Sequence, residues 1–326
     1  MPIRSALCAA ALLLVPLAAT ATAPSASAPV GAGWITLGTM GGPIADPKRS
    51  QPANVLLRGT DAYLVDAGDG TVQRLAAAGV RLNSVRAVFL SHLHFDHTGG
   101  LAAILGLRYQ TDAPGVLIVY GPPGTKRLVD GLVASMQPAA EAGYGLPGAK
   151  ATRPEDLVRT VELQGGARVE LPGIVVTAAE NSHYSFPEGS DAATRYKSLS
   201  FRFDMPERSI VYTGDTGPSA DVERLAKGAD LFVSEVIDLD ATLANVRRNS
   251  PDMPAPAFEA VRRHLAAHHV SPAQVGEMAN RAGVKKVVLT HIVPGTITPQ
   301  VDAAFRAAIA RTFSGPVEIA DDLDRY

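Results

Sequence analysis

Short runs of apolar and β-branched residues recur along most of the chain, separated by polar turns or stretches of helical periodicity. Such runs predict ten buried strands, over 34–39, 54–59, 62–68, 87–92, 116–121, 173–180, 198–204, 209–215, 229–236 and 285–291. Helical spacing predicts helices over 70–78, 124–136, 254–265, 272–282 and 299–310. Because helices close each half of the chain, we expect an α/β sandwich with helices outside two central sheets. The Pro- and Gly-rich stretch 137–154 predicts a surface loop.

The N-terminal segment follows a different pattern. Arg4 is the only charge among the first 28 residues, residues 7–17 form an almost unbroken apolar run, and small residues follow. This order predicts a secretory signal peptide over 1–28 and a periplasmic or secreted protein. The run is too short to span a bilayer, so we expect no stable membrane insertion after cleavage. Residues 29–326 are then predicted to form one domain.

Composition narrows the classes of protein that remain. The chain has 326 residues, of which 46% are hydrophobic and 19% charged, which excludes a disordered chain. Its single cysteine excludes an internal disulfide and a Cys₄ metal site. The net charge of −2 and the 6% aromatic content argue against a nucleic-acid surface and a base-stacking platform.

Metal-ligating side chains gather where the strand over 87–92 ends. His92, His94, Asp96 and His97 fall within six residues of sequence. His92 and His94 are two apart on an extended backbone and therefore point the same way. Imidazoles with one carboxylate suit zinc, manganese or iron. The residues that follow, 98–100, include two glycines that allow a close turn beneath a metal.

Three more candidate ligands end apolar strands elsewhere in the chain. His183, Asp215 and His291 each lie in a turn flanked by glycine or serine. Taken alone, each is more often a core, surface or turn residue. Strand ends on one side of a sheet are, however, where a site can assemble.

The motifs together resemble the metallo-β-lactamase superfamily. The resemblance extends over nearly the whole mature chain, in family order, through LVDAGDG (64–70), SHLHFDHTGG (91–100), NSHYS (181–185), YTGDTGPS (212–219) and LTHIVPG (289–295). It implies a four-layer αββα sandwich with metals at one edge of the two sheets. By the resemblance, Asp66 is a structural acceptor.

The same resemblance implies two divalent metal ions, with zinc as first choice and manganese or iron as alternatives. It assigns His92, His94 and His183 to the first metal, and Asp96, His97 and His291 to the second. Asp215 would bridge the two ions, and a bridging hydroxide would attack the substrate.

A subset of these motifs resembles the ribonuclease Z-like branch, which includes tRNA 3′-processing enzymes, cyclic-nucleotide phosphodiesterases and arylsulfatases. The resemblance rests on YTGDTGPS and on residues 268–292. It implies that His269 faces the scissile phosphate as a general acid or an electrostatic clamp and that Glu235 orients His269. With Asp215, these residues make up the expected catalytic set. His264 and His268 match no motif and are interpreted as surface residues of a helix.

These observations predict an exported metal-dependent hydrolase of a small phosphodiester or an aryl sulfate or phosphate ester. The stretch 137–156 has only two basic residues, so we expect a small-molecule substrate and no nucleic acid; a homodimer stays open. One alternative is a lactonase or β-lactamase-like enzyme that attacks a cyclic ester or amide. The other is a non-catalytic metal-binding protein or a mono-iron redox protein. Tyr184, Tyr196 and Lys197 are candidates for the pocket wall, with core or solvated positions as the alternative.

Overall fold

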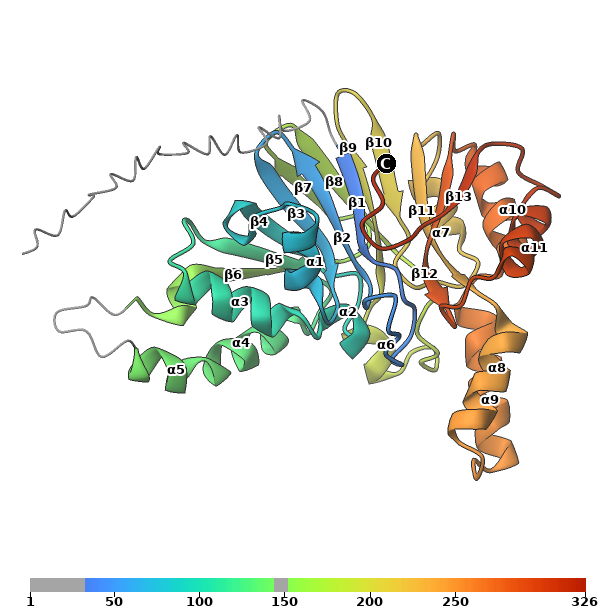
Figure 1. Cartoon of the computed structure of the whole chain (residues 1–326), viewed down its shortest axis with the longest axis horizontal. Coiled ribbons are helices and arrows are strands. Elements are labelled where there is room, and N and C mark those ends of the chain that lie inside the picture. The colour runs from blue at the N-terminus through green and yellow to red at the C-terminus, as the bar shows by residue number, and fades with distance from the viewer. Residues whose placement is uncertain (1–32, 144–151) are drawn as a thin grey trace, which may run out of the picture.

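Two β-sheets pack face to face in the computed structural model, which describes residues 33–143 and 152–326, and helices cover their outer faces (Figure 1). The first sheet has six strands in the order β1-β2-β3-β4-β5-β6, and the second has seven in the order β13-β12-β11-β10-β9-β8-β7. The predicted four-layer αββα sandwich is confirmed.

The strands and helices have the following bounds. The first sheet contains β1 (Gly33–Gly38), β2 (Ala53–Arg58), β3 (Asp61–Ala67), β4 (Val85–Phe89), β5 (Leu117–Gly121) and β6 (Val158–Glu162). The second contains β7 (Arg168–Leu171), β8 (Ile174–Glu180), β9 (Leu199–Asp204), β10 (Ser209–Tyr212), β11 (Leu231–Ile237), β12 (Val287–Val293) and β13 (Val317–Ile319). The helices are α1 (Thr71–Ala77), α2 (Phe95–Thr98), α3 (Leu101–Gln110), α4 (Thr125–Ser135), α5 (Gln137–Ala142), α6 (Asp191–Arg195), α7 (Ala220–Leu225), α8 (Leu239–Asn249), α9 (Ala255–His268), α10 (Pro272–Ala282) and α11 (Pro299–Ile309).

Aromatic side chains fill the space between the sheets. Successive side chains of a strand point to opposite faces, so Phe201 and Phe203 of β9 both face this core. Phe203 is fully buried, with its ring centroid 5.5 Å from that of Phe89 and 5.9 Å from that of Trp34. Both sheets are therefore fixed face to face by interlocking rings.

Helices bury the two outer faces. Helices α1, α3 and α4 cover the first sheet through Leu75, Ile104 and Val129, which join its outward apolar residues. Helices α7, α10 and α11 cover the second through residues that include Val222 and Met278. Strands buried on both faces read as continuous apolar runs, which is why their positions were predictable.

The two sheets meet at the edge where several strands end. Strands β3, β4 and β5 are parallel, as are β10, β11 and β12, so the carboxyl ends within each group lie together. Ile292 of β12 donates its N–H to the Thr39 carbonyl at 2.9 Å, which ties this edge of the second sheet to the chain after β1. Loops that follow β3, β4, β10 and β12 therefore converge.

Some elements differ from the expectation. The stretch 137–154 is not a loop throughout, because α5 continues directly from α4 over its first six residues. Strands β6 and β7 were not predicted, because both are partly exposed and each carries two charged residues, so their apolar signal is weak. The predicted leader over 1–28 lies outside the described residues. Among the residues that the structure does describe, no helix is long and apolar enough to cross a membrane.

Replacing Phe203 with alanine tests the importance of the core between the sheets. We expect Phe203→Ala to lower the free energy of unfolding by about 3 to 5 kcal/mol, because a large cavity would open among packed rings. Val116, 49% exposed, provides the control, and Val116→Ala should change stability by less than ~0.5 kcal/mol. Urea denaturation measures both, and equal effects for the two variants would contradict this packing.

Candidate metal centre

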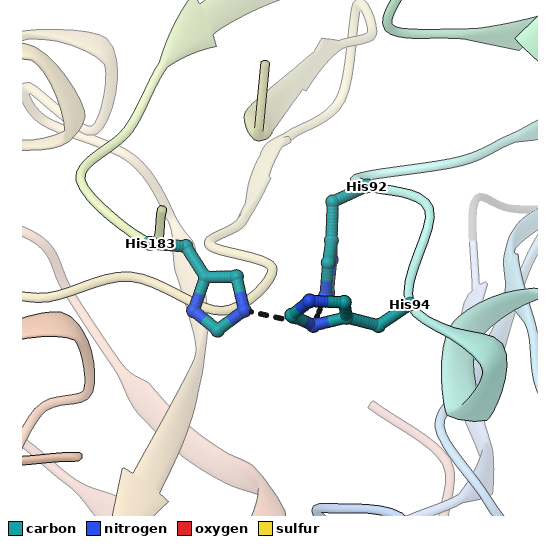
Figure 2. A group of neighbouring side chains, drawn as sticks. All are labelled: His92, His94 and His183. Atoms are coloured by element: carbon teal, nitrogen blue, oxygen red, sulfur yellow. Dashed lines mark hydrogen bonds between the residues drawn. The ribbon is translucent and has the colours of Figure 1, made fainter. Parts of the chain in front are cut away.

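Three histidines from two segments form one half of the site. His92 and His94 come from the turn between β4 and α2, and His183 follows β8. Figure 2 shows the three imidazoles converging. His94 Nδ1 lies 3.0 Å from His92 Nε2 and 3.1 Å from His183 Nε2. The extended backbone at His94 brings it beside His92, as the spacing predicted.

A second group forms on the other side of the same turn. Asp96 and His97 lie in α2, and His291 lies in β12. The Asp96 Oδ2 atom is 3.6 Å from His97 Nε2 and 3.8 Å from His291 Nε2. All three side chains are buried.

The carboxylate of Asp215 lies between the two groups. Its Oδ2 is 3.8 Å from Nε2 of both His92 and His183. Its Oδ1 is 3.3 Å from His97 Nε2 and 3.1 Å from His291 Nε2. Each oxygen thus faces a different pair of imidazoles. The structure brings together all seven side chains that the sequence nominated as ligands.

The donor atoms fit metal ions better than they fit one another. His97 Nε2, Asp215 Oδ1 and His291 Nε2 are buried and have no hydrogen-bond partner. Buried polar atoms are rarely left unpaired, so these three atoms are suited to contact a bound ion. Donor groups of three, such as His92–His94–His183 and Asp96–His97–His291, have their ligand atoms within 4.8 Å of one another. Imidazole nitrogens and carboxylate oxygens at this separation are suited to divalent cations.

The electrostatics differ between the two groups. Burial lowers the pKa of His183 to about 3, against the attraction of Asp215. Burial also lowers the pKa of His92 well below its usual range. On the other side, the carboxylate of Asp215 overcomes burial and raises the pKa of His291 to about 10. Although burial favours the neutral acid, His291 and His97 hold the pKa of Asp215 well below its usual range. A metal ion would replace the protons of the second group.

Asp66 orients one of the candidate ligands. It is fully buried at the end of β3 and has a positive φ of 58°. Its carboxylate accepts hydrogen bonds from the Ser91 N–H at 2.7 Å, the Ser91 hydroxyl at 2.8 Å and the Tyr212 hydroxyl at 2.8 Å. His97 Nδ1 lies 2.7 Å from the same carboxylate, so its N–H donates there and Nε2 faces the site.

Close backbone approaches explain the glycines around the turn. A Cβ on Gly100 would lie 2.2 Å from the Gly68 carbonyl oxygen, and one on Gly68 would lie 2.3 Å from that of Asp96. The loop after β3 therefore packs directly on α2. Gly100 has an ordinary φ of −81°, so close packing requires glycine there.

His269 and Glu235 form a buried pair beside Asp215. His269 Nδ1 lies 2.7 Å from Glu235 Oε2, and the other Glu235 oxygen accepts the Thr216 N–H. Burial opposes protonation of His269, but the Glu235 carboxylate outweighs it and raises the pKa of His269. Ligand atoms of Asp215, His269 and His291 lie within 4.8 Å of one another. The structure therefore brings Glu235 into contact with His269, and its role in orienting that imidazole stays a prediction.

His264 and His268 were wrongly interpreted as surface residues. Both are only partly exposed, because α9 packs its last turns against the segment that carries His183. His264 Nδ1 is 2.7 Å from the Ser185 hydroxyl, and the His268 carbonyl lies 3.2 Å from His183 Nδ1. Their i, i+4 spacing on one helix face was the only signal in the sequence.

Comparison with known proteins places the chain in a family. A family model described as "Beta-lactamase superfamily domain" matches residues 62–292. The chain belongs to the metallo-β-lactamase superfamily. Ribonuclease Z of Mycobacterium bovis (strain BCG / Pasteur 1173P2) is 32% identical over 295 residues, which cover 89% of this chain and 96% of the relative. Ribonuclease Z of Mycobacterium avium (strain 104) is also 32% identical, with the same coverage.

Solved structures agree on the fold of this metallo-β-lactamase superfamily member. The metallo-beta-lactamase fold protein YhfI from Bacillus subtilis has a TM-score of 0.63 at 19% identity, covering 91% of this chain and 99% of its own. The short form of human tRNase Z has a TM-score of 0.60 at 21% identity, covering 90% and 98%. These structures support the fold, while the family model and the ribonuclease Z relatives make the chain a member of a metal-dependent hydrolase family.

The relatives overturn the expected substrate. Two curated relatives are named ribonucleases and one solved neighbour is a tRNase. The prediction of a small phosphodiester or an aryl ester as substrate is therefore wrong, as is the exclusion of nucleic acid. The names of the relatives also give no support to the two alternatives, a hydrolase of a cyclic ester or amide and a mono-iron redox protein. Nor do they support the predicted signal peptide or a periplasmic location. The charge argument failed because it counted only side chains, whereas metal ions also neutralise phosphate. The leader and the location of the protein stay untested predictions.

Asp66 provides a test of how the site is held. We expect Asp66→Asn to weaken metal binding by about 10- to 100-fold, because His97 would lose the acceptor that fixes its tautomer. Zinc competition against a chromophoric chelator measures this on folded protein. The matched control is Asp61→Asn at the partly exposed start of the same strand, where Asp61 pairs with Arg86. Unchanged affinity in Asp66→Asn would show that His97 needs no such support.

Proposed function

We propose that this protein is a metal-dependent ribonuclease that hydrolyses a phosphodiester bond of RNA. The observation that carries the proposal is the position of Asp215, whose two carboxylate oxygens face separate sets of imidazoles. A carboxylate in this position suits a pair of cations, and paired cations are common in enzymes that cleave phosphodiesters.

The donor set favours two zinc ions. His92, His94 and His183 would hold one, while Asp96, His97 and His291 would hold the other, and Asp215 would contribute to both. Five imidazoles and two carboxylates, with no thiolate, are borderline ligands that also admit manganese or iron. Bound there, the cations would act as Lewis acids on phosphate oxygens and lower the pKa of a water molecule.

His269 is suited to protonate the leaving group. Its Nδ1 is occupied by Glu235 at 2.7 Å, so Nε2 is the atom left to meet a substrate. Because Glu235 raises the pKa of His269, the imidazole keeps its proton to a higher pH than an ordinary histidine does. That proton would pass from Nε2 to the departing ribose oxygen as the P–O bond breaks. Glu235 acts through His269 as a positioning residue.

RNA as the substrate is supported by the relatives rather than by the charge of the chain. The match to ribonuclease Z covers 96% of the M. bovis protein, so no large part of that enzyme lacks a counterpart here. The low basic content does not conflict with this proposal, since the cations would neutralise the phosphate at the scissile bond.

Asp215 is the first residue to substitute. We expect Asp215→Ala to lower RNA cleavage at least ~100-fold and to reduce the metal content below two ions per chain, because both ions lose a ligand. A 3′-extended stem-loop RNA serves as substrate, and elemental analysis gives the metal content. Asp221→Ala, which removes an exposed carboxylate paired with Arg224, is the control. If wild-type protein with two bound zinc ions fails to cleave RNA, the proposed function is wrong.

Substitution of the His269–Glu235 pair separates proton donation from metal binding. We expect His269→Ala to lower kcat on RNA by roughly 10² to 10⁴, and much less on bis-(p-nitrophenyl) phosphate, whose leaving group needs no proton. In Glu235→Gln the pKa of His269 falls, so the limb where kcat declines with rising pH should move to lower pH. Equal losses of His269→Ala on both substrates would rule out a role as general acid.

A further inference from the structure

Two exposed phenylalanines lie close in sequence to candidate metal ligands. Among the residues that the structure describes, the large hydrophobic side chains that are most exposed are Ile44, Phe95, Leu107, Val116 and Phe186. Phe95 lies between His94 and Asp96, and Phe186 lies three residues after His183. A phosphodiester strand that is bound at the candidate ligands would come within reach of both rings.

A row of aromatic rings extends from the imidazoles to the surface. The Tyr184 ring centroid is 5.4 Å from that of His94, Phe186 is 5.0 Å from Tyr184, and Tyr196 is 6.1 Å from Phe186. The Tyr184 hydroxyl accepts the Leu93 N–H at 3.3 Å, which holds the inner ring in place. Phe186, 37% exposed, presents its ring to solvent at the middle of the row.

The chemistry of this row favours a flat aromatic group over a charged one. Lys197, next to Tyr196, is paired with Glu180 at 2.8 Å and so is engaged within the protein. Phenyl rings have no hydrogen-bonding groups with which to read a base edge, but they stack on any base. An RNA strand that places a phosphodiester at the metal centre brings its neighbouring bases within reach of the same loops.

We propose that Phe186 and Phe95 are stacking surfaces for bases that flank the scissile phosphodiester. This inference rests on the proposed function and specifies how it selects single-stranded RNA at the cleavage point. Recognition by stacking tolerates any base sequence. The overall aromatic content of 6% does not argue against it, because Phe95 in α2 and Phe186 in the segment after β8 both lie close in sequence to candidate ligands.

Substitutions that keep the side chains apolar but remove the rings test this proposal. Phe186→Leu and Phe95→Leu are compared with wild type, with Phe186→Tyr, which keeps a ring, and with Leu107→Ala, an exposed control on α3. The substrate is an RNA with one cleavage site, used with an intact or an abasic nucleotide next to that site. In wild type, the abasic substitution should raise KM roughly 5- to 150-fold.

For each variant, the KM for the abasic RNA divided by the KM for the intact RNA decides between the outcomes. It should fall toward one in at least one leucine variant and stay at the wild-type value in Phe186→Tyr and Leu107→Ala. A wild-type ratio in both leucine variants would overturn the stacking proposal while leaving the ribonuclease proposal intact.

A binding measurement tests stacking independently of cleavage. RNA that carries 2-aminopurine next to the cleavage site is titrated with metal-free protein, and stacking quenches its fluorescence. We expect quenching by wild type and Phe186→Tyr that is lost in a leucine variant. Equal quenching by all variants would contradict the proposal, even if the protein cleaves no RNA.

Discussion

A single buried carboxylate determines how the centre of this molecule is organised. Asp215 is only 3% exposed and lies within 4 Å of four imidazole nitrogens. Isolated ionised groups are very costly to bury, so a carboxylate survives there only with opposite charge on both sides. Protons on His97 and His291 would supply that charge on one side, and a pair of divalent cations would supply it on both. The strand ends, the packing between the sheets and Asp66 hold the four imidazoles around this carboxylate.

The fold positions the side chains around Asp215 by bringing several strand ends together, and no single helix or strand carries them all. The candidate ligands come from the turn after β4 and from the ends of β8, β10 and β12, which belong to different sheets. Interlocking rings between the sheets set the separation of those ends, and the Ile292–Thr39 hydrogen bond fixes their edge. Asp66 then links the first sheet to the second by accepting hydrogen bonds from both Ser91 and Tyr212. A shift of one sheet against the other would therefore separate the two halves of the centre.

Much of this was predictable from the sequence, for physical reasons that differ between residues. The strands are continuous apolar runs because both their faces are buried, and His92, His94, Asp96 and His97 are adjacent in sequence. His183, Asp215 and His291 needed the family resemblance, since a strand end alone does not fix which strands are neighbours. The position of His264 depends on how α9 packs, and the exposure of Phe95 and Phe186 depends on tertiary structure. Neither is encoded in local periodicity. The prediction of the substrate class was wrong for a related reason, because the net charge of the side chains does not include the cations that the site would bind.

Anomalous diffraction at the zinc edge, from crystals of the zinc-loaded protein, tests the central claim most directly. The account predicts two peaks per chain, one beside each oxygen of the Asp215 carboxylate, with His183 next to one and His291 next to the other. A single peak, or two peaks that both lie away from Asp215, would contradict it.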